Sequence, residues 1–398
     1  MSREDSRPAT LCIHGGRRPG PGDRAVMMPI HQTSTFVPGE DDWRRVEQGE
    51  VAESLFYTRY GNPSIAVVER RLALLEGAEE ARLFASGNAA MHAALLGLAL
   101  PAGRVVASSR LYGGTRAILK DALVPAGGEF EYCDLDDPAA VASAVRPGTS
   151  LVVCESIANP TLEVADLPAI ARRAHEVGAR LVVDATYASP LLQRPLALGA
   201  DVVVHSATKF LGGHSDLIAG AVATSAELAP VLDRQRMVVG GSLDPLAAFL
   251  LDRGLRTLAL RMRAHCEGAS RVAAYLANHP AIERVRHPSL EDFPHHARAA
   301  ALLDGPGAVV FAALRGTDEA AAELLERFEL FLPAPSLGGV ESLASQPART
   351  SHTGMSAAER LEAGIPPGAF RLSVGIEDPD DLVADLEQAL AAVTPGQR

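Results

Sequence analysis

The sequence predicts an α/β fold in which a large, mainly parallel sheet is followed by a smaller α+β segment. Between about residues 64 and 225, short apolar runs rich in β-branched residues alternate with stretches of helical periodicity. The runs are continuously apolar, which is typical of parallel strands covered by helices on both faces. Near residues 242–245 this alternation stops and a long helical pattern begins.

The first elements follow in chain order. Residues 1–60 show no clear period and are rich in Gly, Pro and polar residues, so they are predicted to form an extended arm. A helix is expected at about 64–76, because apolar residues recur on one face from Ile65 to Leu75 and Gly77 ends the pattern. The strands expected after it are the apolar runs 104–107, 151–154, 181–184 and 201–204.

The rest of the chain is predicted to be helical and then α+β. Asp166 and Pro168 have the positions of a cap and a first-turn proline for a helix that ends near Gly178. One long helix is expected at roughly 246–278. The strands expected after it lie at 309–311 and 370–374. The predicted parts are an N-terminal arm, 1–60, a large domain, 61–245, and a small C-terminal domain, 246–398.

Composition and charge exclude several classes of protein. Apolar residues make up 47% and charged residues 22%, an ordinary globular composition. The net charge of −12, without any run of Lys or Arg, argues against a nucleic-acid partner or an anionic membrane surface. No apolar stretch is long enough for a membrane span, and the polar N-terminus carries no secretory signal. The four cysteines are far apart in the sequence, so reduced thiols and a cytoplasmic location are expected. His295-His296 lacks further ligands at metal spacing, so no metal is expected.

Polar and titratable residues follow the ends of three predicted strands, where open α/β sheets build their binding sites. These residues are Glu155 and Asn159, then Asp184, and then Ser206, Thr208 and Lys209. Lys209 is one of only two lysines, against 35 arginines, and an arginine cannot serve as a neutral amine nucleophile. The other lysine, Lys120, has a polar position on an expected helix and is interpreted as a surface charge.

Lys209 and Asp184 supply the pair of groups that pyridoxal phosphate requires, an amine for a Schiff base and a carboxylate for the pyridinium nitrogen. Ser86-Gly87-Asn88 precedes an apolar helix whose free N-terminal amides could hold the phosphate. Read singly, an Asp at a strand end is also common in turns, and Ser-Gly before a helix is also common in loops. The spacing alone leaves both interpretations open.

Longer motifs occur in order along the chain from about residue 12 to 380. They lie at 29–36, 57–63, 111–115, 155–160, 183–187, 205–216, 255–258, 336–343, 351–352 and 371–377. Together they resemble the Cys/Met-metabolism family of pyridoxal-phosphate enzymes, which includes cystathionine γ-synthase, cystathionine γ-lyase, methionine γ-lyase and O-acylhomoserine sulfhydrylase. The resemblance implies a fold-type I PLP-dependent transferase, with the cofactor in the large domain.

The resemblance also implies roles for individual residues. Lys209 would form the internal aldimine with the cofactor and then move protons, and Asp184 would pair with the pyridine nitrogen. Tyr112 would stack on the cofactor ring and exchange protons with the amine or the leaving group. Asn159 would bond the ring oxygen. The residues implied to hold the phosphate are Ser86, Gly87, Asn88, Ser206 and Thr208.

Substrate and partner follow from the same resemblance. Arg371 would clamp the amino-acid carboxylate, with Ser336 and Asn159 beside it. Tyr57 and Arg59 would reach the phosphate of a neighbouring subunit, since the N-terminal arm crosses over in this family. The implied assembly is a homotetramer, a dimer of dimers with shared active sites.

The implied activity is γ-elimination from an L-amino acid through a vinylglycine-type intermediate. On the substrate side this chain has Asn88 where an apolar residue is common, Gly114 where methionine γ-lyases place a cysteine, and Pro335 where cystathionine γ-lyases often have Glu. These departures predict a less usual γ-leaving group, such as an acyl ester, thiolate or halide. A γ-replacement transferase remains open. A cofactor-binding homologue without turnover is disfavoured because Lys209 and its partner residues are all present.

Overall fold

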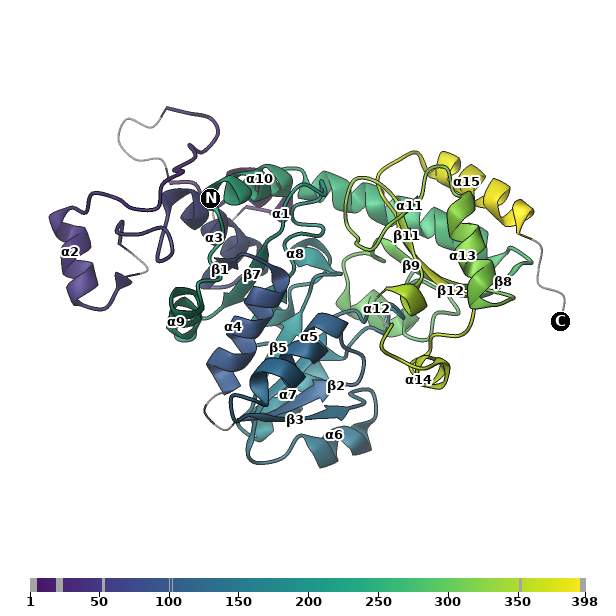
Figure 1. The fold of residues 1–398 in the computed structure, drawn as a ribbon, viewed down its shortest axis with the longest axis horizontal. Coiled ribbons are helices and arrows are strands. Elements are labelled where there is room, and N and C mark those ends of the chain that lie inside the picture. Colours follow the sequence, from purple (N-terminus) through teal and green to yellow (C-terminus); the bar gives the residue numbers. More distant parts are fainter. Residues whose placement is uncertain are drawn as a thin grey trace.

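The computed structural model describes residues 6–18, 24–51, 54–99, 101, 103–350 and 353–393. The motif at 351–352 lies outside these residues. Within them the chain forms a seven-stranded and a five-stranded sheet, and helix α11, Leu258–Ala277, runs from one to the other (Figure 1). The predicted α/β class is therefore confirmed.

The larger sheet is mostly parallel. In the described part of the chain its order is β1-β7-β6-β5-β4-β2-β3, and β7 alone runs antiparallel to its neighbours. Its strands are β1 Glu80–Phe84, β2 Arg104–Ser108, β3 Glu129–Cys133, β4 Thr149–Glu155, β5 Arg180–Asp184, β6 Val202–His205 and β7 Gly220–Thr224. The apolar runs of the sequence correspond to β2, β4, β5 and β6, each within two residues of its expected bounds.

Helices cover this sheet and precede the second one. Those up to residue 255 are α1 Pro8–His14, α2 Glu40–Glu47, α3 Pro63–Glu76, α4 Gly87–Ala99, α5 Gly113–Ile118, α6 Pro138–Ala144, α7 Leu167–Glu176, α8 Ser189–Leu192, α9 Ala229–Val239 and α10 Pro245–Leu255. Short helical turns accompany the regular helices, and those whose bounds the structure describes are η2 Leu119–Leu123, η3 Pro195–Leu198 and η4 Pro347–Arg349.

Both faces of the larger sheet are buried, as the continuous apolar runs predict. In β4, Val152 and Cys154 pack into a core closed by α3, α7 and α10. Leu151 and Val153 of the same strand pack into a second core closed by α4, η2 and α9. Because successive side chains of a strand point to opposite faces, a strand covered on both sides is apolar at every position.

The ends of the predicted helices follow local capping chemistry. Asn62 caps α3, because its side chain accepts a hydrogen bond from the Ser64 N–H at 2.9 Å. Gly77 ends α3 with φ 69°, a left-handed conformation that glycine adopts readily. Asp166 caps α7 by accepting from the Ala169 N–H at 3.2 Å. Both predicted helices are therefore confirmed.

The N-terminal segment differs from the expected extended arm. Residues 8–14 form α1, which packs against α3 and α11 and buries Leu11 and Cys12. A second helix, α2, lies apart from the two sheets at the edge of the molecule (Figure 1). Both helices are short and fewer than three turns long, so the sequence shows too few turns for a periodic pattern to emerge.

The long helix expected at 246–278 is wrong, because the chain forms two helices, α10 and α11. The Gly254 carbonyl accepts from the Thr257 hydroxyl at 3.2 Å and from Nη2 of Arg261 at 2.7 Å. Nη1 of Arg261 also donates to the Phe210 carbonyl at 2.7 Å. The helix therefore breaks where side chains from the start of α11 bond the Gly254 carbonyl, and the long-range contact with Phe210 holds Arg261 in place.

The smaller sheet has the order β10-β11-β12-β9-β8 and is antiparallel except for the pair β10–β11. Its strands are β8 Ile282–Arg286, β9 Val309–Leu314, β10 Leu332–Pro333, β11 Leu343–Ser345 and β12 Ala369–Ser373. Its helices are α12 His296–Leu302, α13 Asp318–Arg327, α14 Ala357–Glu362 and α15 Pro379–Ala392. The strands expected at 309–311 and 370–374 are β9 and β12. The domain boundaries after residues 60 and 245 stay predictions. Among the described residues, no helix has the length and apolar character needed to cross a membrane.

Candidate active site

A cavity of about 700 Å³ opens at the carboxyl ends of β4, β5 and β6. Its wall combines the start of α4 and the loops after these strands with the β10–β11 loop and β12 of the smaller sheet. The predicted site residues that line it are Ser86, Gly87, Asn88, Tyr112, Asn159, Asp184, Ser206, Thr208, Lys209, Ser336 and Arg371. Residues from both sheets therefore meet in one cavity.

Lys209 presents its amine inside this cavity. Its Nζ donates a hydrogen bond to Oγ of Ser336 at 2.7 Å. Burial, and then the charge of Arg371, lower the pKa of Lys209 below its usual value. A lowered pKa makes the neutral amine more available, and this is the form that attacks a carbonyl or accepts a proton. Lys120 lies on η2 and is not among the residues of the cavity wall.

Asp184 ends β5 and is held by Thr186. Its Oδ1 accepts from the Thr186 N–H at 2.9 Å and from the Thr186 hydroxyl at 2.5 Å. The same hydroxyl oxygen accepts from the Ser206 N–H at 2.8 Å, which ties Asp184 to the loop that carries Lys209. Burial raises the pKa of Asp184, and the Thr186 hydrogen bonds only partly oppose this. Thr186 was not predicted, although an Asp followed two residues later by a hydroxyl is a local signal for such a turn.

Glu155 is a second carboxyl group in the cavity wall, and the sequence assigned it no role. Its Oε1 accepts from the Tyr112 N–H, and its Oε2 accepts from the Asn159 N–H at 2.9 Å. In the sheet it pairs with Asp184. Burial, and then the charge of Asp184, raise the pKa of Glu155 to about 8. One side chain therefore holds the backbone of two predicted site residues.

Arg371 lies on β12 with its guanidinium directed at the end of β4. Nη1 donates to Oδ1 of Asn159 at 3.0 Å and to the Tyr187 hydroxyl at 3.1 Å, and Nη2 donates to the Ser336 carbonyl at 2.6 Å. Among the described residues its buried Nε has no partner. Of the five N–H donors of a guanidinium, three are thus used and two remain. Two donors match the two oxygens of a carboxylate. Tyr187, which orients Arg371, lies in the motif at 183–187 but was not predicted as a site residue.

The start of α4 lies at the end of the cavity where the sequence predicts a bound phosphate, which we call the anion-binding end. The first N–H groups of a helix have no partner within it and favour negative charge. A Cβ on Gly87 would lie 2.8 Å from Cβ of Ser206, so glycine is needed for this close approach. Oγ of Ser86 accepts from the Ala89 N–H at 3.1 Å, and the Thr208 hydroxyl exchanges hydrogen bonds with the Ala219 backbone.

Tyr57 and Arg59 do not reach this cavity within one chain. Nη1 of Arg59 donates to the Met237 carbonyl at 2.7 Å, and its guanidinium lies 5.4 Å from the ring centroid of Tyr57 and 4.7 Å from that of Tyr60. Neither predicted residue appears in the cavity wall. The expectation that they serve a neighbouring subunit stays a prediction.

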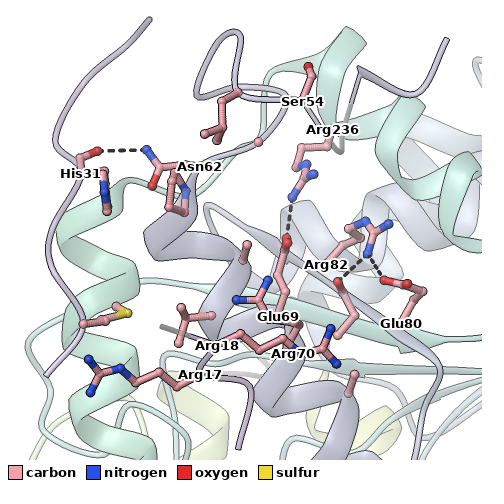
Figure 2. A pocket seen from close by; sticks show the side chains of 18 of the residues that line it. Arg17, Arg18, His31, Ser54, Asn62, Glu69, Arg70, Glu80, Arg82 and Arg236 are labelled. Carbon is pink, nitrogen blue, oxygen red and sulfur yellow. Dashed lines mark hydrogen bonds and ion pairs between the residues drawn. The ribbon is translucent and has the colours of Figure 1, made fainter. Parts of the chain in front are cut away.

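A second and larger cavity of about 920 Å³ lies between α3 and the N-terminal segment, and Figure 2 shows its charged wall. Arg82 pairs with Glu80 at 2.6 Å, and Arg236 pairs with Glu69 at 2.6 Å. No lysine of the described chain lines it. Its arginines outnumber its glutamates, and among the described residues it holds no amine nucleophile, whereas Lys209, Asp184 and Arg371 meet in the smaller cavity. The smaller cavity is therefore the candidate active site.

Comparison with known proteins identifies the family. The family model described as Cys/Met metabolism PLP-dependent enzyme matches residues 9–391. The chain belongs to this family. It is similar to L-methionine γ-lyase of Pseudomonas putida, with 41% identity over 96% of this chain and 97% of that protein. It is also 41% identical to cystathionine γ-synthase of Mycobacterium bovis, over 97% of each chain. The solved structure of cystathione gamma lyase (CalE6) from Micromonospora echinospora has a TM-score of 0.91 and 41% identity, covering 97% of this chain and 100% of that one.

Membership of this PLP-dependent family confirms the predicted cofactor, and the residues of the smaller cavity fit it. A phosphate suits the start of α4, where Gly87 lies close against Ser206. The carboxyl group of Asp184 is available to a ring nitrogen, and the amine of Lys209 is available to a carbonyl carbon. The chain is accordingly a PLP-dependent enzyme of Cys/Met metabolism.

Proposed function

We propose that this enzyme catalyses γ-elimination from an L-amino acid with a γ-leaving group, such as an acyl ester, a thiolate or a halide. The leaving group departs with a proton, and hydrolysis of the remainder yields a 2-oxo acid and ammonium. The observation that carries this proposal is the convergence of Lys209, Asp184 and Arg371 in one cavity. Bound pyridoxal phosphate supplies the electron sink for charge that develops at the substrate Cα.

Arg371 binds and orients the substrate in this proposal. Its two remaining N–H donors face a carboxylate, while Asn159, Tyr187 and Ser336 hold the guanidinium in place. The positive charge of Arg371 also helps to keep the nearby Lys209 amine neutral. The group that binds the substrate thereby supports the group that removes its proton.

Lys209 takes and returns the protons of the reaction. A γ-elimination removes a proton from Cα and then one from Cβ, so it needs a mobile base within reach of both. The Ser336 hydroxyl accepts from the amine at 2.7 Å and holds it near the end of β12. Asp184 would pair with the ring nitrogen of the cofactor, and Tyr112, a residue that is 44% exposed, would stack on the ring and face the leaving group.

The phosphate is assigned to the remaining predicted residues. The N–H groups of Gly87 and Asn88 at the start of α4 donate to it, together with the hydroxyls of Ser86, Ser206 and Thr208. Asn159 bonds the ring oxygen. These assignments are supported by the position of all six residues in one cavity wall.

A γ-replacement is the second candidate, and one observation favours it. The similarity to the Mycobacterium bovis cystathionine γ-synthase is as high as that to the Pseudomonas putida methionine γ-lyase. Both reactions start from the same proton removals, and they differ in whether a nucleophile or water completes the reaction. Access of a thiol to the cavity therefore decides between them.

The proposed assembly is a homotetramer, a dimer of dimers, in the cytoplasm. Tyr57 and Arg59 lie outside the cavity of their own chain, which supports their use by a neighbouring subunit. The free thiols of Cys12, Cys133 and Cys154 agree with a reducing compartment. Residues 61–245 are proposed as the cofactor domain and 246–398 as the small domain.

Product analysis by mass spectrometry tests the proposal. The purified holoenzyme is incubated with O-acetyl-L-homoserine, L-methionine, L-cystathionine and a γ-halogenated amino acid, with and without a thiol. Formation of 2-oxobutanoate without the thiol supports elimination. A thioether product that appears only with the thiol supports replacement instead. Sole turnover of cystathionine contradicts the prediction of a less usual substrate, and a holoenzyme that turns over none of the four contradicts both activities.

A further inference from the structure

Asn88 and Tyr112 line the cavity, and both lie close to Gly114. A Cβ placed on Gly114 would lie 2.7 Å from Oδ1 of Asn88, 3.1 Å from its Nδ2 and 2.5 Å from Cε1 of Tyr112. The carboxamide of Asn88 and the ring of Tyr112 therefore both border the space that the missing side chain of Gly114 leaves. Cε1 is bonded to the carbon that carries the Tyr112 hydroxyl, so this is the polar end of the ring.

The carboxamide of Asn88 is available to a ligand. Asn88 lines the cavity and is exposed, and neither Oδ1 nor Nδ2 has a hydrogen-bond partner among the described residues. Its backbone belongs to the first turn of α4, which faces the anion-binding end. The side chain instead extends to Gly114 and Tyr112. The backbone and the side chain of one residue thus border different parts of the cavity.

We propose that the Asn88 carboxamide determines the class of γ-leaving group by donating a hydrogen bond to a leaving oxygen beside Tyr112. The favoured substrate is then an O-acyl ester of an amino alcohol rather than a thioether. This inference rests on the proposed function, because Tyr112 must face the leaving group for Asn88 to reach it.

The chemistry of the two leaving groups differs at this point. When an acyl ester leaves, the C–O bond breaks, its electron pair goes to oxygen, and a carboxylate with two strong acceptor oxygens forms. When a thioether leaves, the charge develops on sulfur, which is a weak acceptor. A donor placed where charge develops stabilises the transition state more than the ground state. The Nδ2–H of Asn88 therefore favours the ester.

Two nearly isosteric substitutions test this donor in the holoenzyme. Asn88→Leu removes both polar atoms, and Asn88→Asp keeps an acceptor but removes the donor. We expect the ratio of kcat/KM for O-acetyl-L-homoserine to kcat/KM for L-methionine to fall about 3- to 10-fold in each variant, the range of one net hydrogen bond. Cofactor absorbance is measured in parallel, so that any common loss through the phosphate site cancels in the ratio.

Gly114→Ala supplies an independent measurement. Its Cβ displaces the Asn88 carboxamide or the Tyr112 ring, so the same ratio should fall in the wild-type background. In the Asn88→Leu background the alanine has no carboxamide left to displace, and its effect on the ratio should be smaller than in wild type. Such non-additivity is the mark of two residues that act at one point.

The outcomes separate this inference from the proposed function. If both substrates yield 2-oxobutanoate and the ratio is unchanged in Asn88→Leu and Asn88→Asp, the inference is wrong while the proposed function stands. An equal fall for both substrates also overturns it, because Asn88 then acts only through the cofactor. If wild type forms no 2-oxobutanoate from either substrate, the proposed function itself fails.

Discussion

The two cavities of this enzyme contain similar charged groups in opposite arrangements. In the larger one, buried guanidinium and carboxylate groups pair directly, as in Arg236 with Glu69 at 2.6 Å and Asp233 at 3.0 Å. In the smaller one, among the described residues, no ion pair joins Asp184 or Glu155 to Lys209 or Arg371. These charges are separated, and the pKa values of both carboxyl groups and of the amine shift in the direction that burial dictates. Paired charges stabilise the fold. Unpaired titratable groups with shifted pKa values inside a cavity are instead typical of a binding or catalytic site.

The largest expected effect is the loss of the amine in the smaller cavity. Lys209→Ala should reduce formation of the 2-oxo acid at least about 10³-fold, because a positioned base is removed, and should abolish the visible absorbance of the bound cofactor. Coupled assays and absorbance spectra measure both. Lys120→Ala is the matched control and should change neither. Lys209→Ala with more than a tenth of wild-type activity would contradict the assignment.

In the larger cavity the same kind of substitution should affect stability instead of catalysis. Arg236→Met removes the ion-pair partner of the largely buried Glu69, whereas Asp233 keeps its pair with Arg82, so the substitution should lower the free energy of unfolding by about 3–5 kcal/mol. Urea titration measures this, while kcat/KM per folded enzyme should stay unchanged. Arg271→Met breaks the exposed pair with Asp380 and should change stability little. If folded Arg236→Met loses catalytic activity, the larger cavity also serves catalysis, and the distinction drawn between the two cavities is wrong.

Arg371 extends the comparison, because among the residues that the structure describes no carboxylate pairs with its buried guanidinium. Arg371→Lys keeps the charge but loses the planar fork of donors, so kcat/KM should fall about 10- to 100-fold, mainly through KM. Steady-state kinetics over a range of substrate concentrations separates the two constants. A fall confined to kcat with an unchanged KM would mean that Arg371 does not bind the substrate carboxylate.

The last expected effect is a pH dependence of stability that comes from Glu155. In the cofactor-free protein its folded pKa, raised to about 8 from 4.5, means that the folded state keeps a proton that the unfolded chain has lost. This stabilisation is complete below about pH 4.5 and is lost as the pH rises towards 8. The thermal midpoint of wild type should therefore fall relative to that of Glu155→Gln between pH 5 and pH 8.5. If the thermal midpoints of wild type and Glu155→Gln change equally with pH, Glu155 does not titrate in this range.

Some site residues could be predicted from the sequence because their signal is local. Asp184 ends the apolar strand β5, Lys209 follows shortly after the end of β6, and parallel strands bring their carboxyl ends to one edge of a sheet. Gly87 is the first residue of the apolar helix α4. In contrast, the contacts of Glu155 with the Tyr112 N–H and of Arg371 with Tyr187 join residues far apart in the chain. No periodicity or turn pattern encodes such contacts.

The break between α10 and α11 has the same cause. Residues 246–278 have helical character throughout, but the Gly254 carbonyl bonds to Arg261, which is itself fixed by Phe210. Local propensity is worth a few tenths of a kcal/mol per residue, and such tertiary contacts override it. The short helices α1 and α2 were missed because they extend over too few turns to show a period.

The sequence by itself determined the α/β class, the family, the cofactor and the order of the strands along the chain, because these depend on periodicity and on motifs of neighbouring residues. Only the tertiary structure decided which cavity has separated charges, which donors of Arg371 remain, and that Asn88 lies beside the polar end of Tyr112. These properties depend on distances between side chains from different elements. Such distances are set by how the elements pack, and packing is not a local property of the chain.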